Sequence, residues 1–327
     1  METKVSVIIP IYKVASFVER CAESLFSQTL NELEFIFVDD ASPDNSIEIV
    51  KNILHKYPER ACQVKFIRHE QNKGLPSARN SGLAVAEGEY IFHCDGDDYV
   101  EPDMLSTMHQ CAVDNDADIV WCDWFLSFAQ TERYMIQPSF TEPLSAVKSM
   151  LGGGMKYNVW NKIAKRSLYT ENNIVFPSGY GMGEDMTMIM LFAFSDKIMH
   201  IKKALYHYVK TNSSAFSQTY SDRHLIELRY NVDRLESFIH NQYGDSLEKE
   251  LAFMKLEAKF PLLLSNDSSR FNLWSEWYPE SNAYIMNNTH TSLRRRIIQY
   301  FASRKMWLLV KTYNSIFNVI VYGILNK

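Results

Sequence analysis

GLPSARNSGLAVAEGEYIFHCD, residues 74–95, predicts one helix followed by one buried strand. The first part has the composition of a helix, with Gly88 as its terminal glycine. EYIFHCD (89–95) is a short apolar run and predicts a strand that ends at Asp95. A helix leading into a buried strand is the repeating unit of a parallel α/β sheet, so the neighbouring sequence decides whether such a sheet exists.

The same alternation extends toward the N-terminus. Short apolar runs rich in β-branched residues are typical of strands buried on both faces, and three further runs fit this description: VSVIIPIY (5–12), LEFIFVDD (33–40) and QVKFIRH (63–69). Residues 14–28 and 42–57 have helical spacing, and the second segment begins with capping residues. The alternation predicts an α/β fold whose parallel sheet has helices on both faces.

The second half of the sequence is less regular. Residues 117–126 and 196–210 predict further strands, and 141–183 is rich in Gly, Pro and aromatic residues, which indicates loops with short helices. From Ser221 to about Leu264 we expect two amphipathic helices. The chain is therefore predicted to consist of a large α/β domain over 1–220 and a helical region over 221–327.

Composition narrows the function classes. The chain has 327 residues, of which 46% are hydrophobic, enough for a sizeable core. A net charge of −5 gives no reason to expect nucleic acid as a partner. The five cysteines are odd in number and lack a CxxC pair, which favours a reduced compartment and argues against a zinc site. The N-terminal residues do not have the pattern of a signal peptide, so we expect a cytoplasmic protein.

Acidic residues concentrate where two of the predicted strands end. Asp39 and Asp40 end the second strand, and Asp95, Asp97 and Asp98 follow the fourth. A single strand-end aspartate is commonly a cap or a turn residue, but ligands of parallel α/β sheets bind at the carboxyl ends of the strands. Clustered carboxylates suit Mg²⁺ or Mn²⁺, which takes one or two protein carboxylates and fills its other positions with phosphate oxygens and water. The joint placement therefore indicates a metal and diphosphate site.

Other phosphate and cation motifs fit less well. The acidic stretch lacks the terminal glutamate of an EF-hand loop, and GxxxxGK[ST] does not occur. Gly179-Tyr-Gly181-Met-Gly183 does not follow a buried strand at the start of a βαβ unit, so it does not indicate a dinucleotide site. A glycine-rich turn that orients Glu184 and Asp185 is the better interpretation.

Five motifs together resemble the family 2 glycosyltransferases of the GT-A fold. They are, in order, VSVIIPIYK, FIFVDDASPDNS, NKGLPSARNSGLAVAEGEYIFHCDGDDYVEPDML, VWNKIAKRSLY and GEDMTM. The resemblance covers about residues 3–215 and implies a Rossmann-like, mostly parallel sheet with a helical C-terminal extension. It further implies a nucleotide-sugar half over about 1–103 and an acceptor half over about 104–220.

The resemblance also implies an activity. The expected reaction is a metal-dependent, inverting transfer of a hexose or N-acetylhexosamine from a UDP-sugar to a hydroxyl. The acceptor would be a glycan or a lipid-linked oligosaccharide in the synthesis of cell-surface polysaccharide, and the cofactor would be Mn²⁺ or Mg²⁺.

Donor roles follow from the matching positions. By resemblance, Pro10 and Tyr12 cradle the nucleotide base, and Asp39 or Asp40 accepts a hydrogen bond from uracil, with the choice between them open. Lys73 would meet the nucleotide or the diphosphate.

The acidic motif and its preceding helix complete the donor side. The resemblance implies that Arg79 binds the diphosphate, for which guanidinium offers a rigid fork, and that Asp95 contacts the ribose or a metal-bound water. Gly96 lets the backbone approach closely. Asp97, with Asp98, would ligate the metal.

The remaining roles fall in the second half. By resemblance, Asp185 is the general base, and His207 lies where some members place another metal ligand or phosphate contact, although a packed histidine is an equal alternative. The acceptor side would be lined by Trp160, Asn161, Lys162 and Glu184.

The C-terminal segment 290–327 joins basic and apolar residues, and residues 281–327 contain no Asp or Glu. One interpretation is an interfacial helix on an anionic membrane surface at the inner face of the membrane. The other is a helix that packs on the catalytic domain. We favour the first. Lys311, Asn314 and Asn318 argue against a spanning helix, since each is costly in lipid.

Two other functions stay open at the level of sequence. A nucleotidyltransferase also uses strand-end aspartates and a metal, but PIYKVASFVE (10–19) stands where its Gly-rich loop would be expected. A non-catalytic nucleotide-sugar or glycan-binding protein would not need both Asp97 and Asp185. The sequence does not name the sugar, the acceptor or the linkage, and a homodimer is compatible with it.

Overall fold

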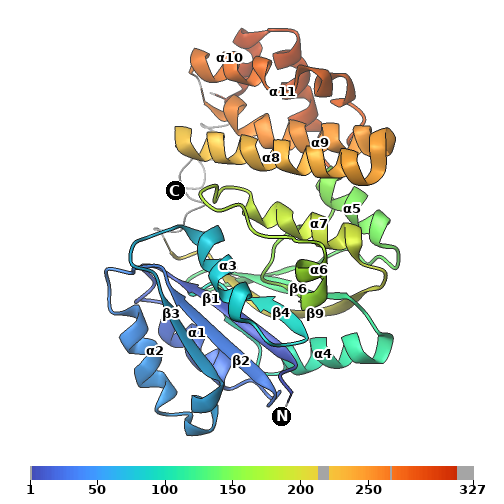
Figure 1. Ribbon diagram of the computed structural model, residues 1–327. Coiled ribbons are helices and arrows are strands. Elements are labelled where there is room, and N and C mark those ends of the chain that lie inside the picture. Colours follow the sequence, from blue (N-terminus) through green and yellow to red (C-terminus); the bar gives the residue numbers. More distant parts are fainter. Residues whose placement is uncertain (1, 213–220, 266, 315–327) are drawn as a thin grey trace. The chain divides into compact units, whose positions relative to one another are not determined.

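The computed structural model describes residues 2–212, 221–265 and 267–314 (Figure 1). Strands and helices alternate in the first part of the chain, and helices dominate its last part. The elements up to residue 209, with η for short 3₁₀-helices, are β1 (Val5–Ile11), α1 (Val18–Phe26), β2 (Leu33–Asp39), α2 (Ser46–Leu54), η1 (Pro58–Gln63), β3 (Val64–Arg68), α3 (Leu75–Val85), β4 (Tyr90–His93), β5 (Tyr99–Val100), α4 (Met104–Asn115), β6 (Ile119–Ser127), β7 (Glu132–Met135), α5 (Pro143–Gly152), β8 (Lys162–Lys165), α6 (Arg166–Glu171), η2 (Glu184–Met186), α7 (Thr187–Phe194) and β9 (Ile198–Val209).

The chain divides into two compact units. The first comprises Met1–Val147 and Tyr157–Asn231, and the second comprises Lys148–Lys156 and Val232–Lys327. The remaining elements are α8 (Asp222–Tyr243), η4 (Gly244–Leu247), α9 (Glu248–Lys259), η5 (Phe260–Leu264), α10 (Ser268–Glu276), η6 (Pro279–Tyr284) and α11 (Leu293–Ser303). The predicted helical C-terminal region is confirmed, and its first two predicted helices correspond to α8 and α9.

The sheet lies in the first unit and has the strand order β3-β2-β1-β4-β8-β6-β9-β5, with β7 paired to β6. β1 is parallel to both of its neighbours, β2 and β4, and β2 is parallel to β3. Every residue of β1, β2 and β4 is buried, as expected of strands that are covered on both faces. The predicted α/β fold, with parallel strands in the first half of the sheet, is confirmed.

The second half of the sheet departs from a parallel arrangement. The predicted strands at 117–126 and 196–210 correspond to β6 and to the single strand β9, which are parallel. The predicted description of 141–183 as loops and short helices missed β8, which pairs antiparallel with both β4 and β6. Four residues are too few to show a period, and pairing on both edges supplies the stability that the sequence of β8 does not reveal.

Two glycines let α3 and the following turn approach β1. A Cβ on Gly82 would overlap the side chain of Ile8, so only glycine allows this close packing of helix and strand. Gly88 does not terminate the helix as predicted, because α3 ends at Val85. Instead, the Gly88 N–H donates to Ser6 Oγ at 2.8 Å, and a Cβ at this position would collide with Ser6. Close approach, and not capping, explains Gly88.

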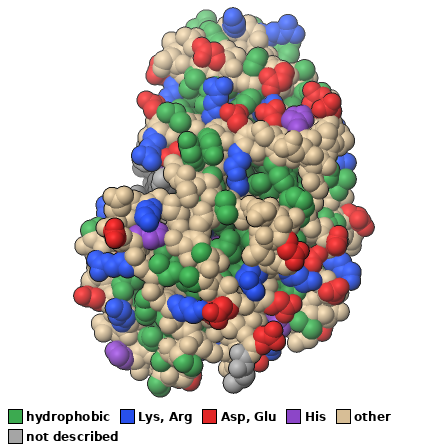
Figure 2. All heavy atoms as spheres, in the orientation of Figure 1, with side chains coloured by type: hydrophobic (Ala, Val, Ile, Leu, Met, Phe, Trp, Pro, Cys, Tyr) green, Lys and Arg blue, Asp and Glu red, His purple; other side chains and the backbone are tan. Residues whose placement is uncertain are grey.

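The distribution of charge and the apolar character of the helices are relevant to binding partners. Acidic and basic side chains are interspersed over the face drawn in Figure 2. Within residues 2–212, 221–265 and 267–314, no helix has the length and apolar character needed to cross a membrane.

Candidate active site

The loops that follow β1, β2 and β4 form the edge of the sheet where the sequence predicts the nucleotide-sugar donor. The carboxyl ends of these three strands lie side by side in the sheet. The first two loops brace each other: the Lys13 N–H donates to Ser42 Oγ at 2.8 Å and the Ala15 N–H donates to Asp44 Oδ2 at 3.0 Å. Lys13 and Ala41 have positive φ angles of 55°, which turn each loop sharply after its strand. The sheet thus holds both loops at one edge.

Asp39 and Asp40, adjacent in sequence, have different surroundings. The Asp40 carboxylate is buried and lies 2.6 Å from His69 Nδ1, and it accepts from the N–H groups of Lys73 and Gly74, each at 2.8 Å. Asp39 Oδ1 accepts from the Ser42 N–H at 2.8 Å, and its Oδ2 lies 3.5 Å from Nε of the exposed Arg68. Asp40 therefore organises the turn before α3, and Asp39 has more capacity left for a ligand.

The other predicted base contacts also lie at this edge. Pro10 is buried within β1, opposite Val38 of β2. The Tyr12 side chain is 41% exposed, so the face of its ring is accessible. Lys73 is exposed on the turn that Asp40 holds through its backbone. The structure brings these residues to one edge of the sheet, and their contacts with a nucleotide stay a prediction.

Arg79 is almost completely buried, with an exposure of 1%. Its Nη2 lies 2.9 Å from Asp95 Oδ1 and 3.7 Å from Glu184 Oε1. Burial opposes the charge, but the carboxylates of Asp95, Glu184 and Asp185 outweigh it and raise the pKa of Arg79. Its Nε and Nη1 have no hydrogen-bond partner among the described residues. Because unpaired buried donors are costly, these two groups indicate that a ligand completes the site.

The acidic turn after β4 contains two kinds of carboxylate. Asp98 is buried, and both of its oxygens are engaged: Oδ2 accepts from the Tyr206 hydroxyl and Oδ1 from the Val209 N–H, each at 2.7 Å. This arrangement does not support the predicted metal-ligand role of Asp98; it ties the turn to β9. Gly96 is buried, and a Cβ there would lie 3.1 Å from the Pro10 carbonyl oxygen, so it lets the turn approach β1.

Asp95 and Asp97 form the more open part of the cluster. The Asp95 side chain is 24% exposed, and Asp97 Oδ2 accepts from Asn212 Nδ2 at 2.8 Å. Burial and the charge of Asp95 raise the pKa of Asp97, so a cation would relieve the repulsion between the two carboxylates. Among the described residues, no group of three or more His, Cys, Asp and Glu side chains could hold a metal by itself. Two carboxylates nonetheless fit Mg²⁺ or Mn²⁺ that shares its ligands with a diphosphate.

His207 is engaged by two glutamates. Its Nδ1 is 2.8 Å from Glu132 Oε1 and its Nε2 is 2.9 Å from Glu101 Oε1. Its ring stacks on Tyr99, with ring centroids 4.1 Å apart. Both ring nitrogens are therefore engaged, and the structure supports the packed-histidine alternative for His207 over a metal-ligand role.

The predicted base, Asp185, belongs to the short helix that also approaches Arg79. Asp185 and Glu184 belong to η2, directly after Gly183, whose φ of 89° allows the turn. Burial and the charge of Asp185 raise the pKa of Glu184 well above its usual range, and burial also raises the pKa of Asp185. Asp185 Oδ1 is buried and lacks a hydrogen-bond partner among the described residues. This oxygen can accept a proton.

The predicted acceptor residues are more deeply buried than a contact surface requires. Trp160 stacks on Tyr206, with ring centroids 4.6 Å apart. Asn161 is fully buried and donates to the Cys122 carbonyl at 2.7 Å. Lys162 Nζ donates to the Asn158 carbonyl at 2.7 Å, and burial lowers the pKa of Lys162 to about 7 although the charge of Asp185 opposes this. Asn161 anchors β8 to β6 in this arrangement.

Tyr206 was not predicted from the sequence. Its hydroxyl donates to Asp98 and accepts from the Asp95 N–H at 3.3 Å, so it joins β9 to the acidic turn. Phe176 was also missed: its ring centroid lies 5.8 Å from Cζ of Arg79, and it covers that guanidinium. Both are aromatic residues in apolar surroundings, so no sequence pattern separates them from core residues.

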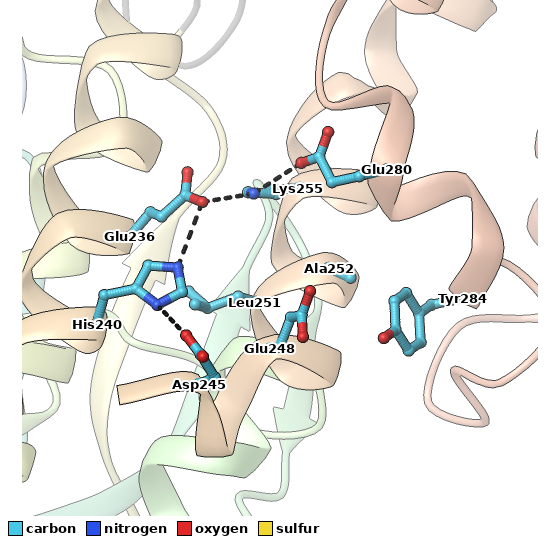
Figure 3. A pocket seen from close by; sticks show the side chains of 9 residues that line it. All are labelled: Glu236, His240, Asp245, Glu248, Leu251, Ala252, Lys255, Glu280 and Tyr284. Carbon is cyan, nitrogen blue, oxygen red and sulfur yellow. Dashed lines mark hydrogen bonds and ion pairs between the residues drawn. The ribbon is translucent and has the colours of Figure 1, made fainter. Parts of the chain in front are cut away.

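The second unit contains a hollow of about 310 Å³ between α8, η4, α9 and η6 (Figure 3). Lys255 Nζ lies 2.7 Å from Glu236 Oε1 and 2.8 Å from Glu280 Oε1. His240 bridges Glu236 at 3.6 Å and Asp245 at 3.5 Å. Burial opposes the charge on Lys255, but its two hydrogen bonds outweigh burial and raise its pKa. The ionic groups are engaged with one another, which explains them as a cluster that holds these helices together.

Comparison with known proteins agrees with this geometry. Residues 6–186 match the family described as glycosyl transferase family 2, and the chain belongs to this family. It is therefore a glycosyltransferase, as predicted. It is 29% identical to the uncharacterized glycosyltransferase EpsJ of Bacillus subtilis over 276 residues, which are 80% of this chain and 77% of EpsJ.

Two further proteins are informative. The chain is 29% identical to the poly(ribitol-phosphate) beta-glucosyltransferase of Bacillus spizizenii over 191 residues, which are 57% of this chain and 29% of that protein. The crystal structure of S. aureus TarS 1–349 in complex with UDP-GlcNAc aligns with a TM-score of 0.72 and 20% identity, covering 98% of this chain and 92% of TarS 1–349. This likeness confirms the fold.

Proposed function

We propose that the chain transfers a hexose or N-acetylhexosamine from a UDP-sugar to a hydroxyl of a glycan or lipid-linked oligosaccharide in cell-surface polysaccharide synthesis. The observation that carries this proposal is Arg79, whose buried Nε and Nη1 lack partners among the described residues beside Asp95 and Asp185. A diphosphate supplies the acceptor oxygens that these donors need. TarS, which shares the fold, binds UDP-GlcNAc, and the Bacillus spizizenii relative acts on poly(ribitol-phosphate).

For the nucleotide we propose that Asp39, and not Asp40, accepts the hydrogen bond from uracil. Asp40 is already engaged by His69 and two backbone N–H groups. Tyr12 would stack on the base with Pro10 beneath it, and Lys73 would approach the phosphates from the turn that Asp40 holds. The exposure of Tyr12 and the spare capacity of Asp39 support these roles.

For the metal we propose Mn²⁺ or Mg²⁺ held by Asp97, with Asp95 directly or through water. When bound, the cation would neutralise the charge that develops on the departing diphosphate. The chain's own contribution is Arg79, whose unpaired N–H groups would stabilise the same charge. The raised pKa of Asp97 supports a cation at this point, since binding would remove the repulsion from Asp95.

For the chemical step we propose a single displacement with inversion. The acceptor hydroxyl oxygen attacks the anomeric carbon, and its proton passes to Asp185 Oδ1. The bond from the anomeric carbon to the phosphate oxygen breaks, and UDP leaves with that electron pair. Glu184 lies beside Asp185 in η2 and, like it, interacts with Arg79. The unpaired Oδ1 of Asp185 supports this role.

On the acceptor side we propose that Trp160, Asn161 and Lys162 shape the pocket from beneath, since each is at least nine-tenths buried. For location we propose the cytoplasm, with the acceptor presented at the inner face of the membrane. A homodimer stays a prediction.

The test measures UDP release from a panel of UDP-hexoses and UDP-N-acetylhexosamines, with and without Mn²⁺, together with UDP binding by calorimetry. Asp185→Asn should lower turnover roughly 10²- to 10⁴-fold and retain UDP binding, as expected for loss of a general base. The exposed Asp196→Asn serves as the matched control. Wild-type turnover in Asp185→Asn would rule out the base, and absence of binding to every UDP compound would rule out the donor class.

A further inference from the structure

The end of the second unit presents an apolar stripe to solvent. Leu293, Ile297 and Tyr300 are 56%, 39% and 42% exposed, and their spacing places them on one side of α11. Ile298 and Ala302 occupy the other side of the helix and are buried. The helix is thus anchored by one side and leaves its second apolar side uncovered by the described residues.

Exposed apolar residues also follow α11 in the chain. Residues 307–314 are again helical, and there Leu308 is 77% exposed and Leu309 is 39% exposed, with Met306 at 43% just before them. Val310 is buried and anchors this turn. An exposed leucine by itself needs no explanation, but successive exposed apolar residues along two consecutive helical segments form a surface that requires a partner.

Cations border this stripe in the sequence. Arg294, Arg304 and Lys305 are exposed, and residues 281–327 contain no Asp or Glu. Arg295 is engaged differently, because its Nη1 lies 2.8 Å from Glu257 Oε2. A basic border around an apolar stripe complements a surface that is apolar within and anionic at its polar layer, which is the profile of an anionic lipid leaflet.

We propose that the docking face, defined as the exposed side chains of Leu293–Ser303 and 306–312, binds an anionic lipid surface. The apolar side chains enter the boundary between headgroups and acyl chains, and the arginines and lysines lie against headgroup phosphates. The face combines apolar side chains with basic ones, and stable membrane binding commonly takes two such signals. Docking in this way would confine the enzyme to the membrane surface that holds a lipid-linked acceptor. The docking itself does not depend on the transfer chemistry.

The experiment uses the full chain and vesicles of phosphatidylcholine with or without phosphatidylglycerol, with binding measured by co-sedimentation. The chain should bind the anionic vesicles, bind neutral ones weakly, and dissociate as salt rises. Arg304→Gln with Lys305→Gln should weaken binding about thirtyfold, since two cations near the surface are lost. Ile297→Ser with Leu308→Ser should abolish it.

Matched controls separate docking from general effects. Ile226→Ser removes an apolar side chain of 66% exposure on α8, and Lys249→Gln removes an exposed cation on α9; both should bind as the wild type does. All altered side chains are exposed, and unchanged thermal unfolding checks that each variant folds. A chain ending at Asn314 should retain binding.

Four outcomes would overturn the proposal. These are no binding of the wild type, equal binding to neutral vesicles, equal binding by the docking-face variants, and loss of binding when only residues 315–327 are removed. A concentration-dependent dimer in light scattering without lipid, lost in Ile297→Ser with Leu308→Ser, would assign the face to a second copy of the chain instead.

Discussion

The two aspartates at the end of β2 allow a sharp test of which residue serves structure and which serves binding. Asp40→Asn loses charge-assisted hydrogen bonds to His69 and to the N–H groups of Lys73 and Gly74, so we expect the free energy of unfolding to fall by about 1.5–3 kcal/mol. Asp39→Asn keeps an oxygen for the Ser42 N–H and should change stability by less than about 0.5 kcal/mol. Urea unfolding measures both.

UDP binding should respond in the opposite order. Asp39→Asn is expected to weaken UDP in calorimetry about tenfold, because an amide is a weaker acceptor than a carboxylate. Folded Asp40→Asn should keep most of the affinity. The opposite result would be a stable Asp40→Asn protein that does not bind UDP and an Asp39→Asn protein with full affinity. That result would assign uracil binding to Asp40 and the structural role to Asp39.

Glu184 tunes the proposed base. Asp185 must be ionised to accept a proton, so turnover should fall as pH drops through its pKa. Burial raises that pKa, Arg79 opposes the rise, Asp95 adds to it, and a hydrogen bond from Glu184 lowers it. Glu184→Ala removes this hydrogen bond and should move the acid limb of the kcat profile to higher pH. Glu184→Gln, whose amide can still donate, should move it less.

The pair of variants is its own control, because both remove the carboxyl group and only one retains a donor. Equal limbs in Glu184→Ala and Glu184→Gln would show that the hydrogen bond to Asp185 does not set the profile. A movement of the acid limb to lower pH in Glu184→Ala would contradict the expectation that Glu184 lowers the pKa of Asp185.

At the scale of the elements, the close packing of α3 against β1 can be tested directly. Gly82→Ala should gain about 1 kcal/mol of helix propensity but place a methyl group against Ile8, and overpacking costs about 1–3 kcal/mol. We expect net destabilisation in thermal or urea unfolding. Ile8→Ala removes the atoms that collide, so the double variant Ile8→Ala with Gly82→Ala should be more stable than the sum of the single changes predicts. Additive effects would show that this contact does not require glycine.

The strands illustrate what sequence could predict. β1, β2 and β4 are continuous apolar runs, and burial on both faces of a sheet leaves this signature. β5, β7 and β8 have two, four and four residues, too few to show a period. β5 and β8 depend on edges offered by β9 and β4, which are distant in the chain, and β7 forms a hairpin with the preceding β6.

The site shows the same limit in its side chains. The residues at the strand ends could be located from sequence, because strand ends meet at one edge. Sequence did not show that both oxygens of Asp98 are used by Tyr206 and Val209, or that Glu101 and Glu132 engage both nitrogens of His207. Those bonds join residues 75 to 111 positions apart, and no local pattern carries that information.

At the scale of the whole molecule, the second unit is not a simple C-terminal appendage. It includes Lys148–Lys156, which precede β8 in the chain. In that unit the Gly152 carbonyl accepts from Asn288 Nδ2 at 3.1 Å, and a Cβ on Gly154 would lie 3.0 Å from His290 Nδ1. The chain therefore leaves the sheet, contributes Lys148–Lys156 to the helical unit and returns to form β8. We expect the stability of both units to depend on this excursion.

A truncation tests that dependence. Ending the chain after Asn231 deletes the residues that hold Gly152 and Gly154, and leaves the segment with Met150, Leu151 and Met155, which are buried in the full chain. Each such side chain contributes about 1.5–3 kcal/mol when buried, so we expect Tm to fall by roughly 10 °C or more, or the fragment to aggregate. Ending the chain after Asn314 keeps the described residues of both units and should leave Tm unchanged in calorimetry. A fragment of residues 1–231 as stable as the full chain would show that the catalytic unit does not need the helical one, because the excursion would then be dispensable for folding.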